Sequence, residues 1–218
     1  MAKKKEDSFW VSYSDMMTSL FFVMLVLFVL VFSYMRYQHQ QLQIQLEEYK
    51  KIEELKKALH NLEGEYFRYD KENKRHELIV PIKFSSGNPE IPNDPELRAN
   101  LLQAGRHLKS VLQSVKIEDD VKYLLIIEGM AARYLPYSDK RNHDLGNIDE
   151  TYALSYNRAK SLFYFWKKNG ITFDEDIVEI QLAGSGWFGT GRFMNSDEGK
   201  NKRFLIQIIP KIGEIERH

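Results

Sequence analysis

The sequence predicts one membrane-spanning helix that continues into a helical stalk, followed by an α/β domain. Three observations lead to this prediction. Apolar residues are concentrated between Phe9 and Tyr34, the next stretch is dominated by Gln, Glu and Lys, and short apolar runs alternate with amphipathic stretches beyond Asp70. We therefore divide the chain into a cytoplasmic tail (1–8), a spanning helix (9–34), a stalk (35–69) and an α/β domain (70–218).

The apolar segment is long enough to cross a bilayer, because about 20 helical residues at 1.5 Å each span a hydrocarbon core of roughly 30 Å. A cleaved signal peptide is the alternative, but "SYMRYQHQQ" after the run offers no small-x-small cleavage site. Three lysines, Lys3 to Lys5, precede the span, and Arg36 is the first base after it. This bias predicts a cytoplasmic N-terminus and a domain in the periplasm, outside the cytoplasmic membrane.

The composition excludes several classes of function. The 31 basic and 31 acidic side chains balance, so no global field favours a nucleic acid as partner. The absence of cysteine excludes disulfides and thiolate metal sites. The six histidines lack metal-ligand spacing and no nucleophile stands out with a base, so we predict no cofactor, no metal and no enzymatic activity.

The stalk carries a heptad-like pattern. Residues 38–68 contain no proline and many good helix formers, so the helix is expected to continue beyond the membrane. Apolar residues recur at spacings of three and four, with one three-residue break, at Leu42, Leu46, Tyr49, Ile52, Leu55, Leu59, Leu62 and Tyr66. This favours a parallel coiled-coil dimer, and the alternative is a single amphipathic helix lying on its own domain or on membrane lipid.

The α/β domain is predicted from alternating patterns. "HELIVPIKF" is typical of a strand and "SSGNPEIPNDPE" of a loop. A helix should begin at Pro95, with Asp94 as its cap, and a second should cover "TYALSYNRAKSLFYFWKKNG" and end at Gly170. Strands are expected at "VKYLLIIEG", "DIVEIQLAGSG" and "RFLIQIIP". The resulting order, βαβαββ, predicts a sandwich with one core.

Asp15 lies inside the apolar run. An ionised side chain near the centre of a bilayer costs at least about 2.5 to 3.5 kcal/mol, so such acids usually face a partner or a path for ions. Ser12 and Ser19 share or adjoin its helical face, and Thr18 adds a third hydroxyl that can solvate a cation or relay a proton. The alternative is that Asp15 lies near the cytoplasmic boundary and reaches back to water.

The membrane segment resembles that of a known family. "FWVSYSDMMTSLFFVMLVLF" is similar to the spanning segment of MotB-type stator subunits, and more so to that of ZorB, the MotB-like protein of Zorya anti-phage systems. The matching residues are Phe9, Trp10, Ser12, Tyr13, Asp15, Met17 and Thr18. The resemblance implies a homodimer whose two helices lie inside a pentamer of MotA-like or ZorA-like subunits. It also implies that Asp15, with Ser12, Thr18 and Ser19, binds and releases H⁺, or alternatively Na⁺.

The distal part resembles the OmpA-like peptidoglycan-binding domain. Three stretches carry the resemblance: "IIEG" at 126–129, "LSYNRAKSL" at 154–162 and "NKRFLIQI" at 201–208. It implies an OmpA-like sandwich in which Arg158 holds a diaminopimelate carboxylate of peptidoglycan, with Asn201 and Arg203 on the closing strand. A planar guanidinium suits bidentate capture of a carboxylate.

Two features depart from the OmpA-like pattern. Ala132 stands where the family has its ligand-binding Asp, and the segment up to Leu154 is longer than usual. The longer segment contains Asp139, Asp144 and Asp149, which are candidates for the missing acid. The alternative is that Arg158 is structural and that the domain dimerises or binds another wall component. The stretch "GSGWFGTG" lacks the Gly-Lys-Ser/Thr of a phosphate loop and is expected to be the loop between the last two strands.

Together these features predict the stator subunit of an ion-driven rotary motor, a MotAB-like 5:2 complex anchored to peptidoglycan. The similarity of the membrane segment to that of ZorB favours the ZorB component of a Zorya defence system over a flagellar or gliding stator. The alternative from another class is a passive OmpA-like wall tether that transports no ion.

Overall fold

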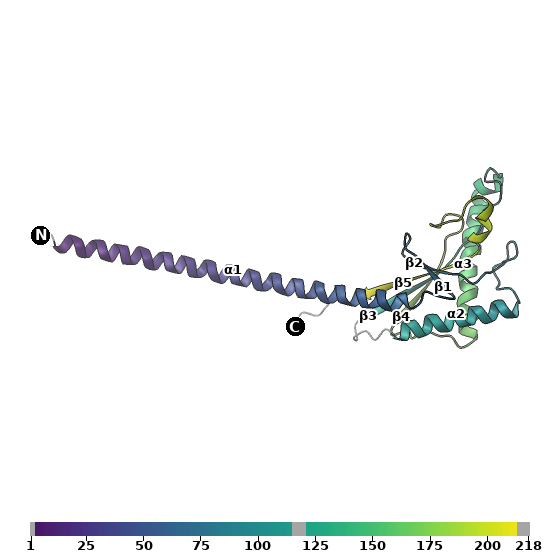
Figure 1. The fold of residues 1–218 in the computed structure, drawn as a ribbon. Helices are drawn as coiled ribbons and strands as arrows, with labels where there is room; N and C mark the ends of the chain where they lie inside the picture. Colours follow the sequence, from purple (N-terminus) through teal and green to yellow (C-terminus); the bar gives the residue numbers. More distant parts are fainter. Residues whose placement is uncertain (1–2, 115–120, 213–218) are drawn as a thin grey trace. The chain divides into compact units, whose positions relative to one another are not determined.

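The apolar run forms part of one long helix in the computed structural model, which describes residues 3–114 and 121–212 (Figure 1). This helix, α1 (Lys3–His60), contains the stretch Trp10–Glu47, which is long and apolar enough to cross a membrane. Its side chains from Trp10 to Gln40 are exposed in the isolated chain, which fits a helix solvated by lipid. The chain divides into two units, Met1–Lys50 and Lys51–His218, and each is described by itself.

The helix ends earlier than the predicted stalk. After His60 the chain turns and enters strand β1 (Phe67–Asp70), which the sequence pattern did not predict. Leu62 is fully buried in the core of the domain, and Leu59 and Tyr66 pack against that core. The last part of the heptad-like seam is therefore used within its own chain. Three earlier members of the seam are exposed: Leu42, Leu46 and Tyr49.

A hairpin opens the domain. Strand β1 pairs antiparallel with β2 (Arg75–Leu78), and the turn between them is stabilised by Asp70, whose Oδ1 accepts hydrogen bonds from the backbone of Glu72 and Asn73. The strand predicted at 76–84 ends at Leu78, because Pro81 has no N–H to donate to a sheet. Val80 and Phe84 are nonetheless buried, so the apolar pattern reports packing rather than strand pairing.

The first helix of the domain lies where it was predicted. In α2 (Pro95–Ser114), Oδ1 of Asp94 accepts hydrogen bonds from the backbone N–H groups of Glu96 and Leu97, at 2.9 and 3.1 Å. This satisfies two of the donors that a helix start leaves unpaired. The predicted apolar face is buried: Leu97, Leu101, Leu108 and Leu112.

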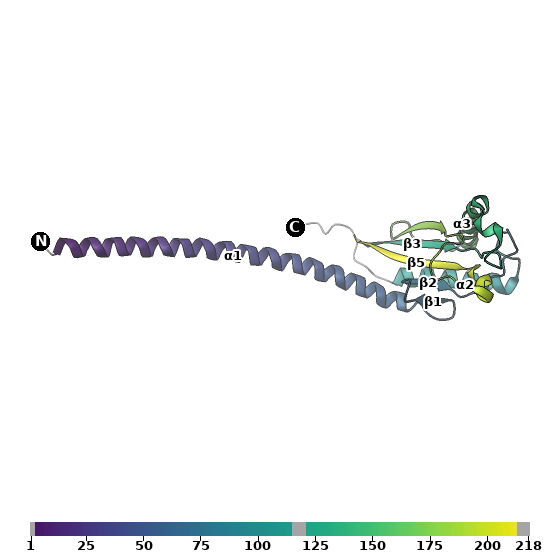
Figure 2. The same cartoon turned by 90° about the horizontal axis from the view of Figure 1, so that it is seen from above.

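The described strands form one mixed sheet in the order β1-β2-β5-β3-β4, which can be followed in Figure 2. β3 (Val121–Gly129) and β4 (Val178–Gly184) are parallel and are joined through η1 (Lys140–His143) and α3 (Leu145–Lys168). After η2 (Asn195–Asn201), β5 (Phe204–Ile212) returns antiparallel between β2 and β3. The predicted fold class, a long helix followed by a mixed α/β domain, is confirmed with one strand, β1, added.

The parallel pair brings the carboxyl ends of β3 and β4 to the same edge of the sheet. Each strand ends in a glycine, and Gly129 and Gly184 are partners in the register. A Cβ on Gly129 would lie 2.1 Å from the carbonyl oxygen of Ser155 in α3, and one on Gly184 would lie 2.3 Å from the backbone nitrogen of Tyr156. Only glycine lets the helix backbone approach these strand ends so closely.

We expect Gly129→Ala to destabilise the domain by about 3 kcal/mol, since the colliding atoms belong to two backbones and cannot rotate away. Gly199→Ala is the matched control, because a Cβ there meets open space, and it should change the free energy of unfolding by less than about 0.5 kcal/mol. Thermal unfolding of the full chain in detergent measures both. Equal stability of the two variants would contradict the close approach.

Candidate functional site

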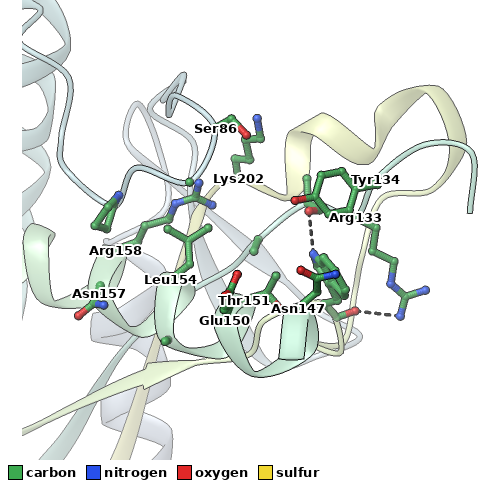
Figure 3. Close-up of a pocket in the computed structure, with 16 residues that line it drawn as sticks. Ser86, Arg133, Tyr134, Asn147, Glu150, Thr151, Leu154, Asn157, Arg158 and Lys202 are labelled. Atoms are coloured by element: carbon green, nitrogen blue, oxygen red, sulfur yellow. Dashed lines mark hydrogen bonds between the residues drawn. The ribbon is translucent and has the colours of Figure 1, made fainter. Parts of the chain in front are cut away.

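A pocket of about 490 Å³ is lined by residues next to the carboxyl ends of β3 and β4 (Figure 3). It is built by the loop before α2, the segment 131–134 after β3, the first half of α3, Trp187 after β4 and Lys202 before β5. Ligand sites of open α/β sheets commonly lie at this end of parallel strands. The pocket is therefore the place where the fold gathers polar groups from several segments.

Arg158 of α3 is the most deeply buried charge in the pocket wall. Its residue surface is 1% exposed, its Nη1 donates to the carbonyl of Met130 at 2.9 Å, and its guanidinium carbon lies 4.4 Å from the centroid of the Phe84 ring. Within the described residues its buried Nε has no hydrogen-bond partner. Figure 3 shows the side chain extending from α3 toward the side of the pocket where Ser86 and Lys202 lie.

The charge of Arg158 distinguishes it from the other buried arginines. Burial lowers the pKa of Arg158 to about 10, so the group stays protonated at neutral pH. Arg75, Arg192 and Arg203 each contact a carboxylate, of Glu128, Glu198 and Glu77 respectively. Arg158 has no such ion pair in the part of the chain that the structure describes. A buried cation without a partner is costly, so this position favours an incoming anion.

Further charged groups surround Arg158 at the pocket. Arg133 and Lys202 add positive charge, and Glu150 supplies an acid. Sequence reasoning missed Glu150, because it began the second helix at Thr151. With the helix beginning at Leu145, Glu150, Leu154 and Arg158 follow at i, i+4 and i+8, the spacing of one helical face. Placing the start of the predicted helix before Glu150 would therefore have put Glu150 on the same helical face as Arg158.

Asn201 and Arg203, the other predicted wall-binding residues, do not line this pocket. The Asn201 side chain donates to the carbonyl of Phe193 and accepts from its N–H, both at 2.9 Å. Arg203 donates to Glu77 and to the carbonyl of Gly191, and its guanidinium lies over the Phe193 ring. Both residues thus hold the connection between β4 and β5, and their role in binding stays a prediction.

The three candidate acids of the long segment are placed elsewhere. Hydrogen bonds from the side chain and backbone of Arg141 lower the pKa of Asp139 to about 2, and Asp139 is the N-cap of η1. Asp144 caps α3 by accepting from the backbone of Asn147 at 2.9 Å, and Asp149 is exposed on that helix. Ala132 lines the pocket, and its carbonyl accepts from Nε1 of Trp187. Glu150 is thus the acid of the pocket wall.

A buried acid fixes the two loops beside the pocket. Glu198 is 1% exposed and accepts hydrogen bonds from the backbone N–H of Arg133, from Tyr137 Oη and from Arg192. Burial alone would raise the pKa of Glu198, but hydrogen bonds from the backbone of Arg133 and from the side chains of Asn201 and Arg192, together with the Arg192 charge, lower it overall. The segment after β3 is thereby held to the segment before β5.

The predicted ion-binding residues lie on α1. Ser12, Asp15 and Ser19 follow at three and four residues, so they occupy one side of the helix. Thr18 Oγ1 donates to the carbonyl of Ser14 at 2.7 Å, which satisfies that hydroxyl within the helix. Asp15 is exposed in the isolated chain. Binding of an ion by these groups stays a prediction.

The stability of the domain should depend on pH through Glu198. Because its folded-state pKa lies below the ordinary value of 4.5, its contribution is fully present above that pH and is lost as the pH falls through the lowered value. Glu198→Gln removes this titration while keeping the shape. Urea unfolding between pH 6 and pH 3 should therefore show a steeper loss of stability for the wild type than for the variant. If the unfolding free energies of the wild type and Glu198→Gln fall in parallel with pH, Glu198 is not the source of the pH dependence.

No protein-family model and no curated protein matches this sequence. Several solved structures are similar to it. The peptidoglycan-associated lipoprotein from Burkholderia pseudomallei is 12% identical and covers 60% of this chain and 88% of that chain, with a TM-score of 0.35. A putative MotB-like protein from Desulfovibrio vulgaris is 14% identical over 65% and 76% of the two chains (TM-score 0.38). The OmpA-like domain of FopA1 from Francisella tularensis is 11% identical over 67% and 79% (TM-score 0.38).

Proposed function

We propose that this protein is a stator subunit of an ion-driven rotary motor, held in the cytoplasmic membrane by α1 and attached to peptidoglycan by its periplasmic domain. The observation that supports the wall-binding part is the buried guanidinium of Arg158, which donates to the carbonyl of Met130 but forms no ion pair within the described residues. The ion-transport part rests on Asp15 within the apolar helix and on the resemblance of that helix to MotB-type segments. The proposal includes no enzymatic activity and no resident cofactor.

The pocket suits a peptide stem that carries carboxylates. A carboxylate oxygen can accept from the guanidinium of Arg158 where it lines the pocket, and a charge-assisted pair of this kind is stronger than a neutral hydrogen bond. Phe84 packs against the guanidinium and keeps it in one orientation. Lys202 and Arg133 add positive charge for further carboxylates of the stem. The match of "LSYNRAKSL" to the OmpA-like motif gives the same position to the ligand-binding arginine.

Ala132 stands where the OmpA-like family has its ligand-binding Asp, and Glu150 is proposed to supply the acid instead. Diaminopimelate carries an ammonium group beside its carboxylate, and the OmpA-like family binds such a ligand with an acid as well as an arginine. Glu150 lies two turns before Arg158 on α3 and lines the same pocket. We therefore propose that the carboxylate of Glu150 binds the ammonium group while Arg158 binds the carboxylate.

The membrane helix is proposed to conduct H⁺, with Na⁺ as the alternative ion. Two copies of α1, one from each chain of a homodimer, would lie inside a MotA-like or ZorA-like pentamer. There an ionised acid is costly unless it faces a partner or a path for ions. We propose that Asp15 faces such a path and alternates between proton-bound and proton-free states as the surrounding subunits turn.

The closeness of the membrane segment to ZorB favours a role in Zorya anti-phage defence. The run from Phe9 to Thr18 carries this assignment, and a flagellar or gliding stator is the second candidate. A passive wall tether is the alternative without ion transport. Loss of ion flux on substitution of Asp15 separates the two stator functions from the tether.

Asp15→Asn should reduce proton flux to background, because the amide cannot bind and release a proton. The measurement is acidification of the cytoplasm or of vesicles that contain the protein with its MotA-like partner, together with phage protection in the native host. Asp7→Asn is the matched control, since it makes the same chemical change outside the apolar run. Flux and protection that Asp15→Asn leaves unchanged, in a complex that assembles normally, would exclude Asp15 as the ion carrier, whereas a wild type without flux above background would leave the tether as the function.

Arg158→Met should weaken binding to purified sacculi by at least about tenfold, because it removes charge-assisted hydrogen bonds to a carboxylate. Methionine keeps an apolar stem over Phe84, and replacing a buried charge with an apolar residue often preserves stability. Arg106→Ala, at an exposed arginine of α2, serves as the control in co-sedimentation of the full chain. Equal retention of wild type and Arg158→Met would exclude carboxylate capture at this pocket.

A further inference from the structure

Two aromatic side chains are exposed beside the pocket without belonging to its wall. Phe188 and Tyr152 are 53% and 40% exposed, and their rings stack with centroids 6.0 Å apart and planes inclined by 14°. Phe188 lies in the glycine-rich loop between β4 and β5, and Tyr152 lies on α3. Large apolar groups that share one exposed surface are typical of binding sites rather than of an inert surface. This pair is therefore a candidate contact surface.

The loop that carries Phe188 is fixed by hydrogen bonds. The N–H of Gly186 donates to Ser155 Oγ at 2.9 Å, and the N–H of Phe188 donates to the carbonyl of Ser185 at 2.9 Å. Trp187 is buried and donates from Nε1 to the carbonyl of Ala132. The next side chain, Phe188, is exposed. The exposed ring is thus held in place before any ligand arrives, which lowers the entropy cost of binding.

Arg133 joins this aromatic pair to the pocket. Its guanidinium carbon lies 5.4 Å from the centroid of the Phe188 ring, and its Nη2 donates to the carbonyl of Trp187 at 3.0 Å. The same residue lines the pocket that contains Arg158 (Figure 3). Tyr134, also in the pocket wall, contacts Trp187 edge to face. The pocket and the aromatic pair therefore form one continuous surface.

We propose that Tyr152 and Phe188 bind a sugar ring of the glycan strand whose peptide stem occupies the Arg158 pocket; this inference rests on the proposed wall-binding function. A pyranose ring presents an apolar face of C–H groups bordered by hydroxyls. Flat aromatic rings fit the C–H face, and the guanidinium of Arg133, which lies over the Phe188 ring, can donate to the hydroxyls. Because stem and sugar are covalently linked, one bound unit of the wall reaches both surfaces.

The test compares two soluble ligands: a diaminopimelate-containing tripeptide, and the same tripeptide attached to its N-acetylmuramyl disaccharide. Calorimetry with the full chain in detergent should show that the wild type binds the disaccharide form about tenfold more tightly. Phe188→Leu and Tyr152→Leu keep apolar volume but remove a flat ring, and each should abolish this preference without changing the affinity for the tripeptide. Tyr164→Leu, at another exposed tyrosine of α3, should keep the preference.

The outcomes separate this inference from the function on which it rests. Equal affinity of the wild type for both ligands, or a preference that survives in both variants, overturns the sugar contact while leaving wall binding intact. The sugar contact is also overturned if Phe188→Leu and Tyr152→Leu lower the affinity for both ligands equally, since the rings would then support the pocket rather than bind sugar. A wild type that binds neither ligand overturns the proposed wall binding and this inference with it.

Discussion

The close contact between α3 and the strand ends is the constraint on which the rest of the domain depends. Gly129 and Gly184 stand side by side at the carboxyl ends of β3 and β4, and the helix backbone at Ser155 rests against both. The hydroxyl of Ser155 also accepts a hydrogen bond from Gly186, so the same residue fixes the start of the next loop. With the helix held at this depth, Arg158 lies one turn further along and is buried over Phe84.

The electrostatics of the domain follow from this placement. Most buried arginines described here are paired, and pairs such as Arg192 with Glu198 and Arg203 with Glu77 fix the loops around the pocket. Arg158 instead donates to one backbone carbonyl and, within the described residues, contacts no carboxylate. Satisfied pairs stabilise a fold, whereas an unsatisfied charge stores binding energy for a ligand. Among the arginines described, Arg158 thus differs from Arg75, Arg192 and Arg203 in contacting no carboxylate.

The proposed stator function would explain why a membrane acid and a candidate wall-binding pocket occur in one chain. Subunits that turn around a pair of helices exert an equal and opposite torque on that pair, and the helices stay fixed only if something rigid resists it. Peptidoglycan is rigid on this scale, and a covalent chain from Asp15 to the Arg158 pocket would transmit the load. The exposed part of the seam, at Leu42, Leu46 and Tyr49, remains available for pairing two such chains.

The sequence by itself determined the elements whose signals are local. The apolar run, the Asp94 cap, the apolar face of α2 and the strand at 121–129 follow from periodicity and capping, and the position of Arg158 from a motif. Tertiary structure decided what depends on distant partners. It buried Leu62 in the core instead of a coiled coil, assigned Asn201 and Arg203 to loop contacts, and brought Glu150 and Lys202 to the pocket. These outcomes depend on which faces meet when helix and sheet pack, and no local pattern records that.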